Sequence, residues 1–213
     1  MRISRYLFTI SGFLSPDLAR TKPAFERLFT TYGLPDRIRT DNGTPFASTA
    51  LGRLSQLSVW WIQLGIVPEL IELGHPEQNG RHERMHRNLK AEATRPPEAD
   101  VTAQQQRFDV FRQEFNQARP HEALKQATPA SVYTVSAKKM PSTLKSLDYP
   151  PHYEVRIVST NSGIRWNSGW VSVSHILAGQ AIGLEAVDDG LWEVWYGPVR
   201  LGRLHEDLMA ILD

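Results

Sequence analysis

The sequence predicts an α/β layered domain followed by a small all-β domain, because its two parts differ in patterning. In the first part, short β-type runs alternate with amphipathic helical stripes, an order typical of helices packed on a sheet. Beyond residue 152, short β-type segments are separated by Asn-Ser-Gly and Asp-Asp-Gly turns, which favours a small β barrel. We therefore predict domains at residues 1–97 and 152–213, separated by a helical extension and linker at residues 98–151.

The first domain begins with a run that alternates aromatic and β-branched residues, Tyr6 to Ile10, and this run predicts a strand. The apolar side chains from Phe25 to Tyr32 recur at helical spacing, and Gly33 is placed to end that helix. A second strand is predicted from Arg37 to Asp41, where an Asn-Gly turn closes it. These elements are those of a sheet covered by helices.

The next segments continue the same alternation. Ser48 can cap a helix whose apolar side chains between residues 54 and 64 share one face. Leu70 to Leu73 fits a brief strand, and a polar helix is predicted from Gln78 to Arg95, where two consecutive prolines stop it. Regularly spaced phenylalanines from Phe108 to Phe115 predict a further amphipathic helix.

Composition excludes several classes of protein. The chain of 213 residues contains no cysteine, which rules out disulfides, thiolate metal sites and a cysteine nucleophile. No apolar run approaches the roughly 20 residues that a membrane span needs, and the first residues do not have the pattern of a signal peptide. We therefore expect a cytoplasmic protein without a membrane partner. Because the net charge is only +1, the local distribution of charge must decide whether nucleic acid is a partner.

Asp41 is the first candidate for chemistry. It stands at the end of a predicted strand and precedes Asn42-Gly43, so the turn would present its carboxylate at the rim of the sheet, where α/β proteins form their sites. An Asp-Asn-Gly sequence is also simply a good turn, and this structural alternative stays open.

Glu83 is the second candidate, within the predicted polar helix. Arg84, Arg87 and Lys90 flank it on neighbouring helical rows, so a carboxylate is set into a basic surface. The segment from His75 to Arg95 is dense in basic side chains, a pattern that indicates a phosphate-binding surface. The alternative is a solvated helix face with ordinary ion pairs.

The same helix contains a formal H-E-x-x-H pattern, from His82 to His86, so a zinc peptidase is a rival interpretation. Two histidines one turn apart could bind zinc. Arginines within and beside the pattern would repel a divalent cation, and no third ligand stands out, which disfavours the peptidase.

Together, TDNGTPFAS and GHPEQNGRHERMHRNLKAE resemble the second and third acidic motifs of the retroviral-integrase-like (DDE-type) transposases of bacterial insertion sequences. The resemblance continues through NQARPHEAL, TPASVY and IRW, and so covers most of the chain. It implies an RNase H-like integrase core with Asp41 and Glu83 as catalytic metal ligands. The resemblance also implies that Asn79, Gly80, Arg84 and Lys90 shape the site or contact DNA. The basic helix adds Arg87 as a further DNA-binding candidate.

The chemistry implied by the resemblance is DNA strand transfer. In that reaction, two Mg²⁺ or Mn²⁺ ions hold the attacking and leaving oxygens of an in-line displacement at phosphorus. Carboxylates suit such ions because hard divalent cations prefer oxygen ligands. The implied partners are DNA, as element ends and target, and further copies of the chain in a homo-oligomer.

One departure from the family pattern concerns its first acidic residue. Family members carry an aspartate on a first strand that precedes the segment matching SRYLFTI, and neither Asp17 nor Asp36 is placed to substitute. We therefore expect an integrase core lacking its first strand and inactive, or nearly so, by itself. The alternative is a remnant that binds DNA without catalysis.

A third hypothesis is a non-enzymatic interaction protein built on the β domain. It would depend on exposed tryptophans, for which the candidates are Trp166, Trp170, Trp192 and Trp195. Tryptophans in a small barrel belong more often to its core, and acidic residues in the segment do not favour DNA binding.

Overall fold

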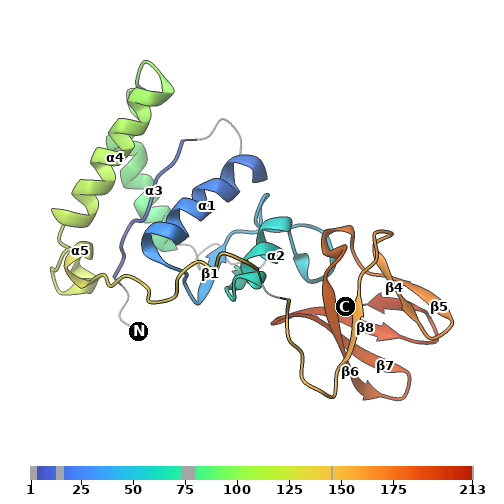
Figure 1. The fold of residues 1–213 in the computed structure, drawn as a ribbon. Helices are drawn as coiled ribbons and strands as arrows, with labels where there is room; N and C mark the ends of the chain where they lie inside the picture. The colour runs from blue at the N-terminus through green and yellow to red at the C-terminus, as the bar shows by residue number, and fades with distance from the viewer. Residues whose placement is uncertain (1–3, 13–16, 73–79, 145, 213) are drawn as a thin grey trace. The chain divides into compact units, whose positions relative to one another are not determined.

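The computed structural model describes residues 4–12, 17–72, 80–144 and 146–212 (Figure 1). The chain folds into two compact units, each built from two separate stretches. Unit 1 consists of Met1–Leu34 and Ile71–Lys139, and unit 2 consists of Pro35–Leu70 and Met140–Asp213. The two units interleave in sequence. The predicted division into residues 1–97, 98–151 and 152–213 stays a prediction. Among the helices that the structure describes, none combines the length and the apolar character required to span a bilayer.

Unit 1 is helical in the part described. Its helices are α1 (Leu18–Tyr32), α3 (Gly80–Ala93), α4 (Val101–Gln117), the single turn η3 (Glu122–Leu124) and α5 (Pro129–Val132). Helix α1 begins where the Asp17 side chain accepts a hydrogen bond from the Arg20 amide, and it ends at Gly33, whose amide donates to the Phe29 carbonyl. Gly33 has a φ of 75°, which favours glycine, as the sequence predicted.

Helices α3 and α4 lie side by side around the apolar core of unit 1 (Figure 1). Ala93, Phe111 and Phe115 are buried there, and partly buried Met85 and Leu89 of α3 pack against them. The phenylalanine spacing that predicted α4 therefore marks the side of the helix that faces this core. The opposite side of α3 is polar and exposed.

The predicted strand from Tyr6 to Ile10 is wrong, because residues 4–12 form no strand. Side-chain amides of α4 bond to the backbone of this segment instead. Asn116 accepts from the Leu7 amide and donates to the Leu7 carbonyl, both at 2.9 Å. Gln105 donates to the Ile10 carbonyl at 2.8 Å and accepts from the Gly12 amide at 3.2 Å. Apolar alternation indicated correctly that the segment is packed, but not that a helix would supply its hydrogen bonds.

Unit 2 contains a parallel pair of strands, β1 (Arg37–Thr40) and β2 (Val67–Leu70). The first agrees with the prediction, whereas the second lies earlier than the predicted Leu70 to Leu73. Between them are the helical turn η1 (Leu51–Arg53) and helix α2 (Gln56–Gln63).

The predicted helix cap at Ser48 is wrong. The cap of α2 is Ser55, whose hydroxyl accepts from the Ser58 amide while the Ser58 hydroxyl accepts from the Ser55 amide. The Ser48 hydroxyl donates instead to the Leu54 carbonyl. Both serines can cap a helix, and only the path of the chain decides between them.

The rest of unit 2 is a five-stranded antiparallel sheet, in the order β3-β6-β7-β8-β9, and a separate β4-β5 hairpin. The short β-type segments predicted beyond residue 152 agree with these strands. The strands are β3 (Glu154–Ile157), β4 (Gly163–Trp166), β5 (Gly169–Ser172), β6 (Ala181–Asp188), β7 (Leu191–Tyr196), β8 (Val199–His205) and β9 (Ala210–Leu212), with the helical turn η4 (His175–Leu177) between β5 and β6.

The core of unit 2 unites both of its stretches of chain. Leu54, Val59 and Ile62, from around α2, are buried in one cluster with sheet residues such as Leu184 and Tyr196. Burial of this apolar surface is the main stabilising contribution in the unit. The segment that carries β1 and α2 therefore packs with the C-terminal strands.

Two of the four tryptophans considered as an interaction surface share one acceptor. Trp166 is 3% exposed, and its indole N–H donates to the Glu206 carboxylate at 2.8 Å. Trp192 donates to the same oxygen at 2.9 Å, and the two rings meet edge to face with centroids 4.8 Å apart. Of these four tryptophans, only Trp170 is exposed, with 42% of its surface accessible to solvent. These contacts favour a structural role for Trp166 and Trp192.

Glu206→Ala is expected to destabilise unit 2, because it leaves two indole N–H groups without their acceptor. Loss of a charged acceptor for buried donors costs about 1 to 3 kcal/mol. Glu206→Gln keeps one acceptor oxygen and should cost less. Urea unfolding followed by tryptophan fluorescence measures both variants. Equal stability of the wild-type chain and Glu206→Ala would show that the indoles do not depend on this carboxylate.

Candidate functional site

Asp41 directly follows β1 in unit 2, and its side chain is exposed. Its Oδ1 accepts a hydrogen bond from the Gly43 amide at 3.1 Å, which orients the carboxylate across the turn. A Cβ atom on residue 43 would lie 3.3 Å from that oxygen, so a larger residue there would crowd the carboxylate. The Asp-Asn-Gly sequence thus fixes one carboxylate oxygen at the end of a strand.

The loop that follows Asp41 is anchored by aromatic packing. The Phe46 ring stacks on Trp61 of α2 with centroids 6.2 Å apart, and Trp61 is fully buried. The Ser55 hydroxyl donates to the Phe46 carbonyl at 3.0 Å. The position of Asp41 is therefore supported by the core of unit 2 and not by the turn alone.

Three charged side chains lie on the strands next to Asp41. Arg37 and Arg39 alternate with half-buried Ile38 and Thr40, so both arginines project from the exposed face of β1. Both bind Glu69 of β2: Arg37 Nη1 lies 2.7 Å from Glu69 Oε1, and Arg39 Nη2 lies 3.1 Å from Oε2. The hydrogen bond from Arg37 is the main cause that lowers the pKa of Glu69.

This charged cluster was not predicted from the sequence. Alternation of arginine with apolar residues from Arg37 to Thr40 was a signal that one face of the strand is exposed. Glu69 carried no such signal, because its contact with the arginines depends on the parallel register that places Arg39 opposite Glu69.

Glu83 lies in the first turn of α3 in unit 1 and is exposed. Arg84, Arg87 and Lys90 are exposed as well, while Met85 and Leu89 turn toward the apolar core. The predicted basic surface of this helix is therefore exposed, and its other face is packed. Gly80 begins the helix, and a Cβ atom there would have nothing within 4 Å.

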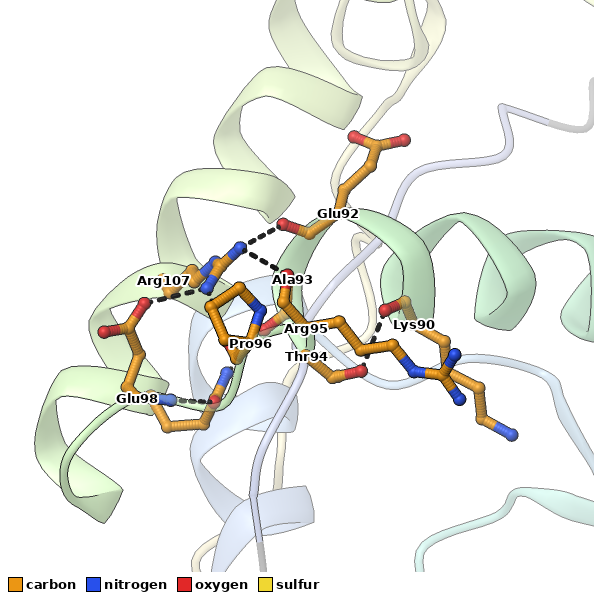
Figure 2. A network of polar contacts seen from close by, with 9 residues as sticks. Lys90, Glu92, Ala93, Thr94, Arg95, Pro96, Glu98 and Arg107 are labelled. Atoms are coloured by element: carbon orange, nitrogen blue, oxygen red, sulfur yellow. Dashed lines mark hydrogen bonds and ion pairs between the residues drawn. The ribbon is translucent and has the colours of Figure 1, made fainter.

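The C-terminal end of α3 is closed by side chains of α4, as Figure 2 shows. The Arg107 guanidinium donates to the carbonyls of Glu92, Arg95 and Pro96 at 2.8, 3.2 and 2.9 Å, and to the Glu98 carboxylate at 2.9 Å. Gln104 donates to the Ala93 carbonyl at 2.6 Å. The last carbonyls of a helix have no partner within the helix, so these donors satisfy groups that would otherwise need water.

A second contact joins the same helices. Arg119, which follows α4, binds both carboxylate oxygens of Glu92, and its guanidinium lies 4.9 Å from the centre of the Phe111 ring. The hydrogen bond from Arg119 lowers the pKa of the Glu92 carboxyl. Helix α3 is therefore held to α4 by apolar packing along its length and by charged groups near its end.

The structure places all but one of the predicted site residues. Asn79 lies outside the described residues, Asp41 belongs to unit 2, and Gly80, Glu83, Arg84, Arg87 and Lys90 belong to unit 1. Each carboxylate is therefore described within its own unit. In the described part of the chain, no group of three or more His, Asp or Glu side chains is arranged to hold a metal ion.

Comparison with known proteins gives a family match for part of the chain. Residues 64–129 match the family described as "Integrase core domain". This segment contains Glu83 and the whole of α3 and α4, whereas Asp41 precedes it. The match supports the predicted integrase core for this segment, and the five-stranded antiparallel sheet lies beyond the matched residues.

The particular relatives are proteins of bacterial insertion elements. The chain is 30% identical over 108 residues to the "Insertion element IS407 uncharacterized 31.7 kDa protein" of Burkholderia multivorans, covering 50% of this chain and 37% of the relative. It is 36% identical over 101 residues to the "Insertion element IS476 uncharacterized 39.2 kDa protein" of Xanthomonas euvesicatoria, covering 46% and 27%. The match thus spans well under half of each relative, and it confirms the predicted resemblance to integrase-like transposases of insertion elements.

A solved structure is similar in outline only. It is the simian T-cell lymphotropic virus intasome in complex with PP2A regulatory subunit B56 gamma, with a TM-score of 0.46 and 15% identity over 87% of this chain and 64% of that chain. A likeness of this degree carries no argument about function.

Arg107→Ala is expected to destabilise unit 1 by about 1 to 3 kcal/mol, because it removes the donors of the Glu92 carbonyl in the last turn of α3 and of two carbonyls just after the helix. Arg107→Lys should recover only part of the loss, since an ammonium group cannot reach several acceptors as a planar fork does. The measurement is urea unfolding, with hydrogen exchange of the α3 amides.

Arg112→Ala is the matched control, because Arg112 is also on α4, has the same 29% side-chain exposure and makes one long contact of 3.7 Å to Asp109. It should change stability by less than about 0.5 kcal/mol. Equal effects of the two alanine variants would contradict a special role of Arg107.

Proposed function

We propose that this chain is part of a DNA-transposing enzyme of the integrase-core type, in which Asp41 and Glu83 bind Mg²⁺ or Mn²⁺ and the basic face of α3 binds DNA. The observation that carries the proposal is the placement of Glu83 on an exposed basic helix face within the segment that matches an integrase core domain. Asp41, exposed at a strand end, supplies the second carboxylate.

The Asp41 and Glu83 carboxylates are chemically suitable ligands for Mg²⁺ or Mn²⁺. Both are exposed, and carboxylate oxygens are the ligands that Mg²⁺ and Mn²⁺ prefer. When bound, such ions would neutralise charge on the attacking and leaving oxygens of a phosphoryl transfer. The chain's own residues would orient the ligands: Gly43 and Phe46 position Asp41, and the α3–α4 contacts position Glu83.

The carboxylates are fewer than a two-metal site needs. Two acidic positions match the family motifs, and the described residues contain no group of three metal-ligating side chains. We propose that residues 1–213 alone carry out strand transfer poorly or not at all, and that a further carboxylate is required.

The proposed DNA contacts come from one helix face. Arg84, Arg87 and Lys90 are exposed there, while Asn79 and Gly80 would lie where the backbone approaches the site. Because cationic side chains contact phosphates without regard to base sequence, this surface provides affinity and not specificity. The complete enzyme would bind element ends and target DNA as a homo-oligomer.

A second candidate is a DNA-binding remnant without catalysis. The same shortage of metal ligands favours it, since phosphate binding by α3 does not need a metal site. Both candidates predict DNA binding, and they differ in whether Asp41 and Glu83 jointly bind a divalent cation.

The 213-residue chain is expected to bind random-sequence duplex DNA with an affinity that falls steeply as salt rises, because bound phosphates release counterions. Replacing Arg84, Arg87 and Lys90 together by Gln should weaken binding and lower the slope of log affinity against log salt by about 2 to 3. Fluorescence anisotropy over a salt series measures both.

The control removes the same charge from another helix of unit 1, by replacing Arg20, Lys22 and Arg27 of α1 with Gln. It should change the slope by less than about 1. If both triple variants bind like the wild-type chain, the basic face of α3 is only a solvated surface.

A further inference from the structure

We propose that Arg37 and Arg39 form a phosphate-binding site beside Asp41, which takes a backbone phosphate of DNA, and that Glu69 occupies this site when DNA is absent. The inference rests on the proposed function, because it assumes that DNA approaches Asp41. It adds residues that lie outside the DNA-binding face of α3.

The geometry gathers two cations around one anion. Arg37 Nη1 lies 2.7 Å from Glu69 Oε1, while Arg39 Nε and Nη2 lie 3.3 and 3.1 Å from Oε2. Each guanidinium has five N–H donors, so Glu69 uses only a part of the donors that the two arginines present. The site thus retains positive charge and donor capacity with Glu69 in place.

All members of the cluster are accessible to solvent. The side chains of Arg37 and Arg39 are 67% and 56% exposed, and that of Glu69 is 26% exposed. Ion pairs at such positions contribute little, because water screens the charges and long side chains lose freedom. A phosphate could therefore displace the Glu69 carboxylate, since it offers more acceptor oxygens and fits the guanidinium fork in a bidentate manner.

The position along the strand links this cluster to the candidate catalytic carboxylate. Arg37, Arg39 and Asp41 alternate in sequence and are all exposed. Arg37 and Arg39 project from one face of β1, and Asp41 directly follows the end of that strand, two residues after Arg39. A DNA strand whose reacting phosphate is at Asp41 would bring a neighbouring phosphate to the arginines.

Glu69 has a second role in this arrangement. Arg37 lowers the pKa of Glu69, so its carboxylate is ionised at neutral pH and offsets the repulsion between the two guanidinium groups. Asp36 contributes a further negative charge near Arg37. The carboxylates therefore keep the arginines extended toward a shared acceptor before DNA arrives.

The structural alternative is that Glu69 and the arginines only stabilise the pairing of β1 with β2. The two interpretations predict different outcomes for Glu69→Gln. If the cluster only stabilises the strands, Glu69→Gln and Arg39→Gln both lower stability slightly and leave DNA affinity unchanged. If Glu69 competes with phosphate, Glu69→Gln tightens DNA binding while Arg39→Gln weakens it.

The experiment measures binding of the full chain to a random-sequence fluorescent duplex across a salt series, with stability followed by urea unfolding. We expect Arg39→Gln to weaken binding about 3-fold to 10-fold and to lower the salt slope by about 1, and Arg37→Gln to act in the same direction. Glu69→Gln should tighten binding by a similar factor. Arg203→Gln is the matched control, because Arg203 is also an exposed strand arginine that shares one glutamate with a second arginine, and it should leave affinity unchanged.

The outcomes separate this inference from the proposed function. If the α3 triple variant loses affinity while Arg37, Arg39 and Glu69 variants bind like the wild-type chain, the phosphate site is overturned and the proposed function stands. If the wild-type chain binds no duplex at all, both are overturned. Weaker binding by Glu69→Gln would also contradict the displacement by phosphate.

Discussion

The junction between α3 and α4 is the constraint on which the position of Glu83 and its basic neighbours depends. A helix exposes unpaired carbonyls at its C-terminal end, and here Arg107 and Gln104 of α4 donate to the carbonyls of Glu92 and Ala93. Apolar contacts of Met85 and Leu89 with the core of unit 1 fix which side of α3 is buried. The direction of the helix and its rotation are thereby set, so Glu83 and its basic neighbours are presented together on the exposed face.

Much of the secondary structure could be predicted because periodicity records burial. The regularly spaced phenylalanines of α4 and the end of α1 at Gly33 agree with expectation, since local pattern and tertiary packing coincide there. The segment from Tyr6 to Ile10 does not form the predicted strand. Alternation shows that a segment is packed, but not which groups form hydrogen bonds with its backbone. Asp41 and Glu83 were selected from motifs, whereas Glu69 could not be, because its role depends on strand register.

The two carboxylates are supported by different parts of the chain. Asp41 depends on the loop that Phe46 anchors to Trp61, and Glu83 depends on the α3–α4 contacts. In the proposed function, affinity for a divalent cation would require both carboxylates.

The most direct test is a Mn²⁺ titration of the isotope-labelled full chain, followed by paramagnetic broadening of backbone amide signals. A shared site predicts that the Gly43 amide, next to Asp41, and the Arg84 amide, next to Glu83, broaden over the same range of Mn²⁺ concentration. It further predicts that Asp41→Asn suppresses the broadening at Arg84 as well as at Gly43, because the ion loses one of its ligands. Unchanged broadening at Arg84 in Asp41→Asn would contradict a metal site shared by the two carboxylates.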